Sequence, residues 1–534
     1  MKKFAKLLSV LLCLVLVLSG CDIPQLAQPQ ETTEAAYSGM TFSKMTYIRP
    51  DMAEIQKVLD NACYVATQDV SMAKLLMAIG EYYDCYDDFY TNYRLADIHY
   101  CLDMTDPYWE EEYNFCLENA DKLEAGLDTL YRALAKSPNR ETLDQPANFG
   151  PGFLDQYEGE SMWDETFSSL MNREAQLQGQ YYELSSGVYD ETFLDETAPE
   201  LAEILVELVQ VRQEMAAYLG YDSYPQFAYD YYYYRTFTPE EAEDYFLEIR
   251  DTLVPIYAQV DVSHLQELAE EHCTEEKTFT YLKQAADNMG GDIRRAFNTM
   301  ERSRLYDLTY SENKYPTSFE TYLFTYQLPF VFICPTETVL DKLTFAHEFG
   351  HFTNDYLCGG SYVGVDVSEV QSQTMEYMAL TYGPQEDLLT QYKMVDSLSV
   401  YVEQAAMALF EQQMYSLTGE ELTAESIQAL YEKTCLEFGF DAFGFDPREY
   451  VAISHLYIGP MYMPSYVVSN DLAMQIYQLE LEEEGKGLEL YEECLYSQDA
   501  YLADFVDTYG LEDPLTPGRI KQVAEIFQKE LTMQ

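Results

Sequence analysis

Apolar residues recur at intervals of three and four positions over most of this 534-residue chain, which is the period of amphipathic helices. The period is clearest in residues 52–68, 119–137, 197–221 and 394–419. The sequence Thr-Pro-Glu-Glu at 238–241 is typical of a helix start, because Thr caps the first turn, Pro fits its first position and Glu completes a capping box. The chain shows no short internal repeat, so a solenoid is not expected. The pattern predicts a mainly α-helical protein.

Residues 306–335 break this helical pattern. Residues 321–335, TYLFTYQLPFVFICP, are aromatic and β-branched and are flanked by Ser, Asn and Pro, which predicts a strand or a hairpin. An edge strand at this point could pair with an extended peptide through main-chain hydrogen bonds. The alternative is a short sheet that only packs against the helices.

The N-terminus is typical of a bacterial lipoprotein. Residues 1–20 combine a basic start with a short apolar core, which predicts a secretory signal peptide. The end of this segment, Leu-Ser-Gly-Cys at 18–21, resembles a lipobox in which Cys21 becomes the lipidated first residue. Residues 21–45 are rich in Pro, Gln, Thr and Glu and predict a flexible tether. We therefore expect a lipid-anchored protein on the extracytoplasmic face of the cell membrane; a plain signal peptide or an uncleaved anchor is the alternative.

Composition narrows the class of partner. The formal net charge is −62, and such a surface repels nucleic acid and anionic lipid headgroups, so no nucleic-acid partner is expected. Hydrophobic residues make up 47% of the chain, which is enough for a sizeable core. The 11 Cys are scattered without a CxxC pair, which argues against a zinc ribbon or a disulfide framework.

Residues 347–351 read His-Glu-Phe-Gly-His, an HExxH motif in a stretch with helical periodicity. Positions i and i+4 share one face of a helix, so His347 and His351 can bind one metal ion. Zinc suits this pair because it accepts imidazole and carboxylate ligands and, in catalytic sites, keeps one position open for water. Glu348 lies one residue further round, where it can reach that water without being a ligand. The alternative, two structural histidines on an ordinary helix, is disfavoured because the chain has only 6 His.

A catalytic zinc site needs a third protein ligand. The HExxHxxGxxH pattern is excluded because Asn354 and Leu357 stand where it requires Gly and His. Glu369 is the best candidate, eighteen residues after the second histidine and on a second predicted helix. Asp355 and Asp366 are rival carboxylates, although the position of Asp366 favours a helix N-cap.

The second predicted helix contains the sequence Glu-Val-Gln-Ser at 369–372, an ExxS pattern. Glu376 lies two turns after Glu369 on the same helical face, where it can orient a metal ligand through a hydrogen bond. The pairing of HExGH with a later ExxS resembles the zinc site of the M3 family of oligopeptidases, which includes thimet oligopeptidase and oligoendopeptidase F. The loop between the two motifs is shorter here than is usual in the family. Residues 208–227 also resemble M3 enzymes, in which an Arg-bearing helix ends in a Leu-Gly-Tyr turn.

A third stretch that resembles the family lies at residues 454–473. Peptide hydrolysis builds an oxyanion, and hydrogen-bond donors beside the metal stabilise it. His455, Tyr462 and Tyr466 resemble the C-terminal His and Tyr pair with which M3 enzymes face the substrate carbonyl. Two prolines interrupt this segment and shift its register, and Tyr457 is the main rival for a donor role.

The resemblance implies an architecture as well as a site. It implies a mainly α, two-lobed helical shell around a deep substrate channel, with a small β-sheet beside the HExxH helix. It further implies an N-terminal helical region at 46–200 and an M3-like catalytic peptidase region at 201–534. Short peptides are the expected substrates, because folded proteins would not enter such a channel.

The expected function is therefore a zinc-dependent endopeptidase with one Zn²⁺ ion. Glu348 would take a proton from the attacking water and pass it to the leaving amine. No GxSxG elbow and no Cys motif with a matched His competes with this interpretation. A zinc carboxypeptidase and a catalytically inactive peptide-binding lipoprotein remain as alternatives, and Glu348 disfavours the second because a binding protein does not need it.

Overall fold

The computed structural model describes residues 39–532, apart from 160–163, 186–190, 261–264, 266, 267, 269 and 443. The predicted signal peptide, Cys21 and most of the predicted tether lie outside the described residues. No helix in the described part of the chain is both long and apolar enough to cross a membrane.

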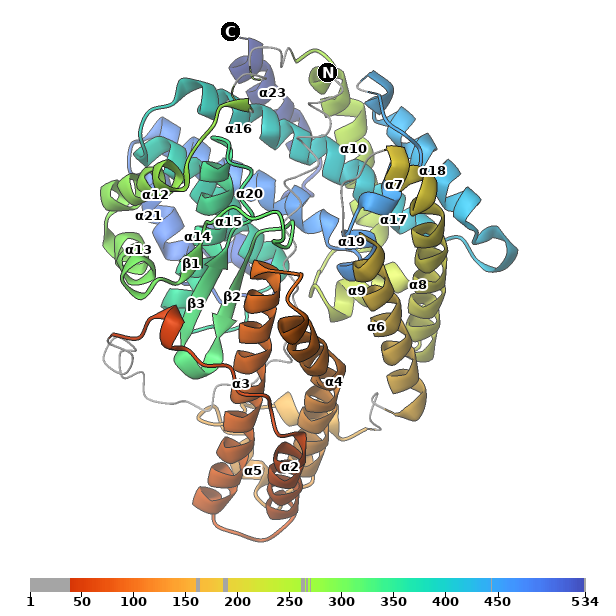
Figure 1. Ribbon diagram of the computed structural model, residues 1–534, viewed down its shortest axis with the longest axis vertical. Coiled ribbons are helices and arrows are strands. Elements are labelled where there is room, and N and C mark those ends of the chain that lie inside the picture. Colours follow the sequence, from red (N-terminus) through yellow and green to blue (C-terminus); the bar gives the residue numbers. More distant parts are fainter. Residues whose placement is uncertain are drawn as a thin grey trace.

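Helices make up most of the described chain, as the periodicity of the sequence predicts (Figure 1). The α-helices are α2 (Met52–Ala66), α3 (Met72–Leu102), α4 (Pro107–Ala135), α5 (Arg140–Leu143), α6 (Glu165–Ser185), α7 (Glu191–Glu196), α8 (Ala198–Tyr218), α9 (Tyr224–Tyr231), α10 (Pro239–Tyr257), α12 (Glu275–Met289), α13 (Gly291–Ser303), α14 (Asp341–Cys358), α15 (Val365–Tyr382), α16 (Asp387–Ser399), α17 (Ala405–Met414), α18 (Ala424–Glu437), α19 (His455–Ile458), α20 (Met463–Glu482), α21 (Lys486–Cys494), α22 (Leu502–Tyr509) and α23 (Arg519–Thr532).

Local signals account for individual helix ends. At the start of α10 the Thr238 side chain accepts a hydrogen bond from the Glu241 amide at 3.2 Å. The Glu241 side chain in turn accepts from the Thr238 amide at 2.8 Å. This reciprocal pair is the capping box that the sequence predicts, and Pro239 occupies the first helical position.

A three-stranded sheet interrupts the helices directly before α14. Strand β1 (Tyr306–Asp307) runs parallel to β3 (Leu328–Phe332), and β2 (Phe319–Leu323) pairs antiparallel with β3. The strand order is β1-β3-β2, so β3 is central and β2 lies at an edge. The predicted hairpin at 321–335 is confirmed, with its first strand beginning two residues earlier. The small sheet packs beside the HExxH helix, as the resemblance implies.

Two apolar cores hold these elements together. The smaller core lies within α2, α3, α4 and the segment up to Leu154, and it forms the helical bundle that projects at the bottom of Figure 1. The larger core runs from the sheet through α14, α15 and α20 to α23 at the C-terminus. The nine cysteines in the described part of the chain are free thiols, so packing carries the stability there.

Helices α14, α15 and α20 pack side by side inside the larger core and carry most of the predicted site residues. Gly350 makes the close contact between α14 and α15 possible. A Cβ atom at this position would lie 2.6 Å from Ser372 Cα and 2.9 Å from the Gln371 carbonyl oxygen. Only glycine therefore lets α15 approach the HExxH helix so closely. Helix α14 ends at Cys358 and is capped by Gly359, whose φ of +69° is the left-handed conformation typical of a helix C-terminus.

Candidate metal centre and active site

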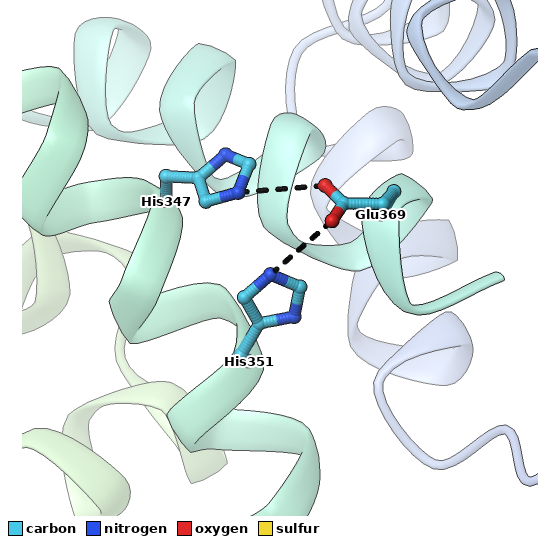
Figure 2. Close-up of side chains that lie close together, drawn as sticks. All are labelled: His347, His351 and Glu369. Atoms are coloured by element: carbon cyan, nitrogen blue, oxygen red, sulfur yellow. Dashed lines mark ion pairs between the residues drawn. The ribbon is translucent and has the colours of Figure 1, made fainter. Parts of the chain in front are cut away.

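His347 and His351 lie one turn apart on α14, and both side chains point to Glu369 on the neighbouring helix α15 (Figure 2). His347 Nε2 is 3.4 Å from Glu369 Oε2, and His351 Nε2 is 4.0 Å from Glu369 Oε1. One donor atom from each residue lies within 4.8 Å of the other two. All three side chains are buried, and no other group of this kind occurs among the described residues. The structure thus brings together the three residues predicted as metal ligands.

The two histidines fit a metal ion. Both Nε2 atoms are buried and make no hydrogen bond of regular geometry with a described residue. Two buried ring nitrogens that face a carboxylate are an unsatisfied donor set, which a divalent cation would satisfy. Two imidazole nitrogens and one carboxylate oxygen are the ligands of many catalytic zinc sites, and they leave a coordination position for water.

The other ring nitrogen of each histidine is held by a neighbour. His347 Nδ1 lies 2.9 Å from Glu376 Oε1, and Lys393 Nζ lies 2.7 Å from the other oxygen of Glu376. His351 Nδ1 lies 2.9 Å from the hydroxyl oxygen of Ser368. Such partners orient a histidine so that Nε2 points to the metal, and a carboxylate also makes that nitrogen a stronger ligand. Glu376 occupies the orienting position that the sequence predicts, whereas Ser368 and Lys393 were not predicted.

Electrostatics match this arrangement. Burial lowers the pKa of His351 to about 4, so its imidazole is neutral near pH 7. Burial opposes a charge on His347 as well, but the hydrogen bonds and charges of Glu369 and Glu376 outweigh it and raise its pKa well above the usual value. Although burial acts to raise the pKa of Glu369, its contacts with the two histidines lower that pKa to about 2. The cluster therefore presents an ionised carboxylate, and a cation stabilises this charge in a buried site.

The two rival carboxylates are engaged elsewhere. Asp355 lies further along α14, where it hydrogen-bonds Glu320 of β2, and burial raises the pKa of Asp355 to about 7. Asp366 lies in the first turn of α15 and accepts two hydrogen bonds from Arg235. The predicted N-cap role of Asp366 is wrong, because Gly364 occupies that position and the Asp366 carboxylate binds a distant guanidinium instead.

Glu348 follows His347 directly on α14 and is fully buried. Burial raises the pKa of Glu320 on β2 well above its usual value, and the charges of Asp355 and Glu348 add to this effect. Glu348 and Glu320 are thus close in space although 28 positions separate them in the sequence. Glu320 was not predicted, because a single Glu in a strand gives no signal of its own.

His455, Tyr462 and Tyr466 form a second cluster next to the predicted ligands. The Tyr462 hydroxyl donates to Glu369 Oε1 at 2.5 Å, and the Tyr466 hydroxyl lies 3.4 Å from His455 Nε2. Their ring centroids lie 5.1–5.8 Å apart. Burial lowers the pKa of His455 to about 4 and raises that of Tyr462 well above its usual value. His455 and Tyr462 are therefore neutral hydrogen-bond donors or acceptors at pH 7. The rival Tyr457 donates to the Leu201 carbonyl and stacks on a core tyrosine, away from Glu369.

Comparisons with known proteins agree with this description. A family model described as the Peptidase M3 N-terminal domain matches residues 42–161. A solved structure described by name as an oligoendopeptidase F has a TM-score of 0.80 at 19% identity, and the match covers 93% of this chain and 99% of that one. PZ peptidase A with an inhibitor has a TM-score of 0.79 at 19% identity, with 92% and 99% covered. A protein from Bacillus anthracis, also described as an oligoendopeptidase F, has a TM-score of 0.78 at 19% identity, with 93% and 98% covered.

No curated protein matches the chain by sequence. The structural matches, at these identities, establish the fold. The chain has an oligoendopeptidase F-like fold, mostly helical with a small three-stranded sheet.

Proposed function

We propose that this protein is a zinc-dependent endopeptidase that hydrolyses short peptides. The observation that carries the proposal is the buried set of His347, His351 and Glu369, whose donor atoms lie within 4.8 Å of one another beside a second cluster of neutral donors. The Peptidase M3 N-terminal match and the oligoendopeptidase F-like fold support a peptidase. Fold alone does not specify chemistry, so the proposal rests on the site.

His347, His351 and Glu369 would hold the zinc ion. When bound, zinc supplies Lewis acidity, which lowers the pKa of a water ligand and polarises a peptide carbonyl. Glu348 would accept the proton of the attacking water and return it to the leaving amine, as a general base and then a general acid. Its complete burial removes competing solvent from the carboxylate and strengthens its interaction with a nearby proton.

The second cluster would bind the carbonyl oxygen of the scissile bond. The Tyr466 hydroxyl and the His455 imidazole are adjacent, so either can donate to an oxygen on which negative charge develops. Tyr462 already donates to Glu369, so it would orient the carboxylate in the resting protein. Such preorganised donors contribute more in a buried site than in water.

The edge strand β2 offers a place for the peptide backbone. It pairs with β3 on one side, and no other described strand pairs with its opposite side. Because β2 packs against α14, a peptide extended along this strand would lie next to the helix that carries the general base. Main-chain pairing binds peptides without selecting side chains, which suits an enzyme that accepts short peptides of many sequences.

The proposal is tested with the full-length chain, purified in detergent and loaded with zinc. Wild type and Glu348→Gln are incubated with quenched peptides of several lengths, and the products are mapped by mass. We expect internal cleavage by wild type only, with about one zinc per chain in both proteins. His347→Ala should lose the zinc, whereas His272→Ala, which changes an exposed histidine outside the site, should keep it.

Each other outcome contradicts a specific part of the proposal. Release of single C-terminal residues by wild type would indicate a carboxypeptidase. Zinc binding without any cleavage would indicate a peptide-binding protein. Absence of zinc from wild type would show that the three ligands are wrongly assigned.

For the location of the protein we propose a lipid anchor at Cys21 on the extracytoplasmic face of a bacterial membrane. The support is the basic and apolar segment 1–20 followed by a lipobox-like sequence. Cys21→Ala should move the protein from the membrane fraction to the soluble fraction or leave its leader uncleaved. Cys13→Ala, which changes the other cysteine of the leader, should leave the protein in the membrane fraction.

A further inference from the structure

Tyr462 of the second cluster lies in a turn between two helices, outside regular secondary structure. After the short helix α19, residues 459–462 form a turn before α20 begins at Met463. Met461 in this turn has a φ of +64°, in the left-handed region that residues with a side chain rarely adopt. Such a conformation persists only where surrounding groups hold the backbone. The position of Tyr462 therefore depends on contacts from other elements.

Arg235 supplies the central contact. Its Nη1 donates to the Met461 carbonyl at 2.9 Å, and its Nη2 donates to the Ser465 hydroxyl at 2.8 Å. The same guanidinium donates to both carboxylate oxygens of Asp366 at 3.0 Å. The side chain of Arg235 is 0% exposed and that of Asp366 is 3% exposed, so water does not compete for these bonds. One side chain thus binds both the turn before α20 and the first turn of α15.

Neighbouring side chains hold the guanidinium and the turn in place. The rings of Tyr229 and Tyr233 lie 4.5 and 4.3 Å from the guanidinium carbon of Arg235, within cation–π distance. The Tyr233 hydroxyl donates to the Pro460 carbonyl at 2.7 Å. Glu411 accepts a hydrogen bond from the Met461 amide at 2.9 Å. Side chains from other elements therefore bind both of the consecutive peptide groups that flank Met461.

A second buried arginine, Arg212, also binds the segment of the second cluster, but it does not connect that segment to α15. Arg212 of α8 donates to the carbonyls of Leu456 and Tyr457 and pairs with Glu174, so it holds the segment that follows His455. Among the described residues, none of the hydrogen-bond partners of Arg212 belongs to α14 or α15. Arg212 fixes the second cluster to α8, whereas Arg235 joins that cluster to the helix that carries Glu369.

We infer that Arg235 is a positioning residue that sets the spacing between the metal ligand Glu369 and the donors that face the substrate carbonyl. Asp366 lies one turn before Glu369 on α15, and Met461 directly precedes Tyr462. A displacement between the two sides of the site therefore has to break the hydrogen bonds of this guanidinium as well as the direct bond from the Ser465 hydroxyl to Asp366. The inference rests on the proposed function, since the spacing matters only where a peptide is held between the ligands and the donors.

The test is a pair of matched double variants in the full-length chain. Arg235→Gln/Asp366→Asn removes both charges of the bridge, so that no unpaired buried charge remains. Arg519→Gln/Asp471→Asn makes the same change in a buried pair between α23 and α20, whose side chains are 5% and 0% exposed. Both variants lose one buried Arg–Asp pair, but only the first loses the connection between α15 and the turn.

We expect the first variant to keep about one zinc per chain and its KM, while kcat falls roughly 10- to 100-fold, because donors displaced by about 1 Å stabilise the transition state poorly. Its affinity for a phosphinic peptide, which mimics the transition state, should fall by a similar factor, and its affinity for a simple hydroxamate should not. The control variant should stay within about threefold of wild type in each constant. Equal losses of kcat in both variants, or no loss in the first, would overturn the inference.

Two further measurements keep the inference testable in every case. If the double variant does not fold, Ser465→Ala removes one of the four hydrogen bonds of Arg235, and a kcat unchanged from wild type would then contradict the inference.

If wild type cuts no peptide, the proposed function has failed, but replacement of zinc by Co²⁺ still gives a visible spectrum of the site. A spectrum that changes in the first variant and not in the control supports the bridge, because the Tyr462–Glu369 bond is then altered. An unchanged spectrum in both refutes it.

Discussion

Gly350→Ala should separate α14 from α15 and weaken the metal site without touching a ligand. The added Cβ would lie 2.6 Å from Ser372 Cα and 2.9 Å from the Gln371 carbonyl oxygen, whereas ordinary contacts begin near 3.4 Å. Both neighbours are backbone atoms, so no side chain can rotate away. The helices must therefore move apart by about 0.8 Å, a typical consequence of overpacking.

The size of the effect follows from the position of Glu369 three residues before Ser372. His347 Nε2 and Glu369 Oε2 are 3.4 Å apart, close enough for one ion to bind both atoms. A shift of about 0.8 Å is several times the tolerance of a zinc–ligand distance, which is about 0.2 Å. We expect a zinc Kd that rises roughly 10- to 100-fold, together with a loss of about 1–3 kcal/mol in the free energy of unfolding.

The assay is competition for zinc with a chromophoric chelator, combined with thermal unfolding of the metal-free protein. Gly80→Ala in α3 and Gly179→Ala in α6 are matched controls, because a Cβ at either helical position meets no atom within 4 Å. These two changes should stabilise the protein by roughly 0.5–1 kcal/mol, since alanine loses less entropy in a helix than glycine. A Gly350→Ala protein that is stabilised like the controls and keeps its zinc affinity would refute the reasoning.

Three further predictions concern single residues. Lys393→Met should raise the zinc Kd roughly 10-fold, because Glu376 loses the cation that holds its second oxygen 2.7 Å away, as titration with a competing chelator would show. Tyr466→Phe should lower kcat roughly 100-fold with zinc retained, because a donor to the carbonyl oxygen is lost, as steady-state kinetics would show. Glu411→Gln should gain stability relative to wild type as the pH rises from 5 to 8, which thermal unfolding at each pH would measure.

The sign of the last effect follows from the pKa values. Burial raises the pKa of Glu411 to about 8 in the folded protein, whereas a carboxyl group in the unfolded chain titrates near about 4.3. Between about pH 4.3 and about pH 8, the folded state therefore keeps a proton on Glu411 that the unfolded state releases. The contribution of Glu411 is fully present below about pH 4.3 and is lost as the pH rises through about 8. Glutamine is neutral throughout and does not suffer this loss.

Each of these predictions has a control and an outcome that contradicts it. Lys283→Met, which breaks a partly exposed ion pair with Glu301, should leave the zinc Kd unchanged, so equal weakening in both lysine variants would contradict the role of Lys393. Tyr457→Phe should leave kcat unchanged because its hydroxyl binds the Leu201 carbonyl, and an equal loss of kcat in both tyrosine variants would contradict the role of Tyr466. A stability difference between Glu411→Gln and wild type that does not depend on pH would contradict the raised pKa.

Local patterns in the sequence were sufficient for several parts of the fold and the site. The helical period places His347 and His351 on one face whatever surrounds them, because residues four apart on a helix are always neighbours. The capping box at Thr238 and the hairpin at 321–335 are likewise set by side chains within a few positions of one another. The resemblance to M3 oligopeptidases, carried by the HExGH and ExxS motifs, anticipated the helical fold and the sheet beside α14.

Such patterns could not predict contacts between residues that lie far apart in the sequence. Arg235 and Asp366 are 131 positions apart, and neither belongs to a motif that names the other as partner. The interpretation of Asp366 as an N-cap failed for this reason: the residue type suits a cap, but Gly364 occupies the cap position and the Asp366 carboxylate binds a buried guanidinium instead. The same holds for Lys393, which reaches Glu376 only because α16 packs beside α15.

The sequence by itself thus determined the helical periodicity, the hairpin and the pair of histidines that can share a metal ion, because these depend on the geometry of short segments. Together with the family resemblance it named Glu369 to join the histidines and Tyr462 and Tyr466 to face them, but it left Asp355 and Asp366 as rival carboxylates and Tyr457 as a rival tyrosine. The tertiary structure decided both. The close contact that Gly350 permits brings Glu369 to the two histidines, and the bridge through Arg235 brings Tyr462 to Glu369. Close packing and buried charge pairs therefore select one residue among several of the same type, which composition alone does not distinguish.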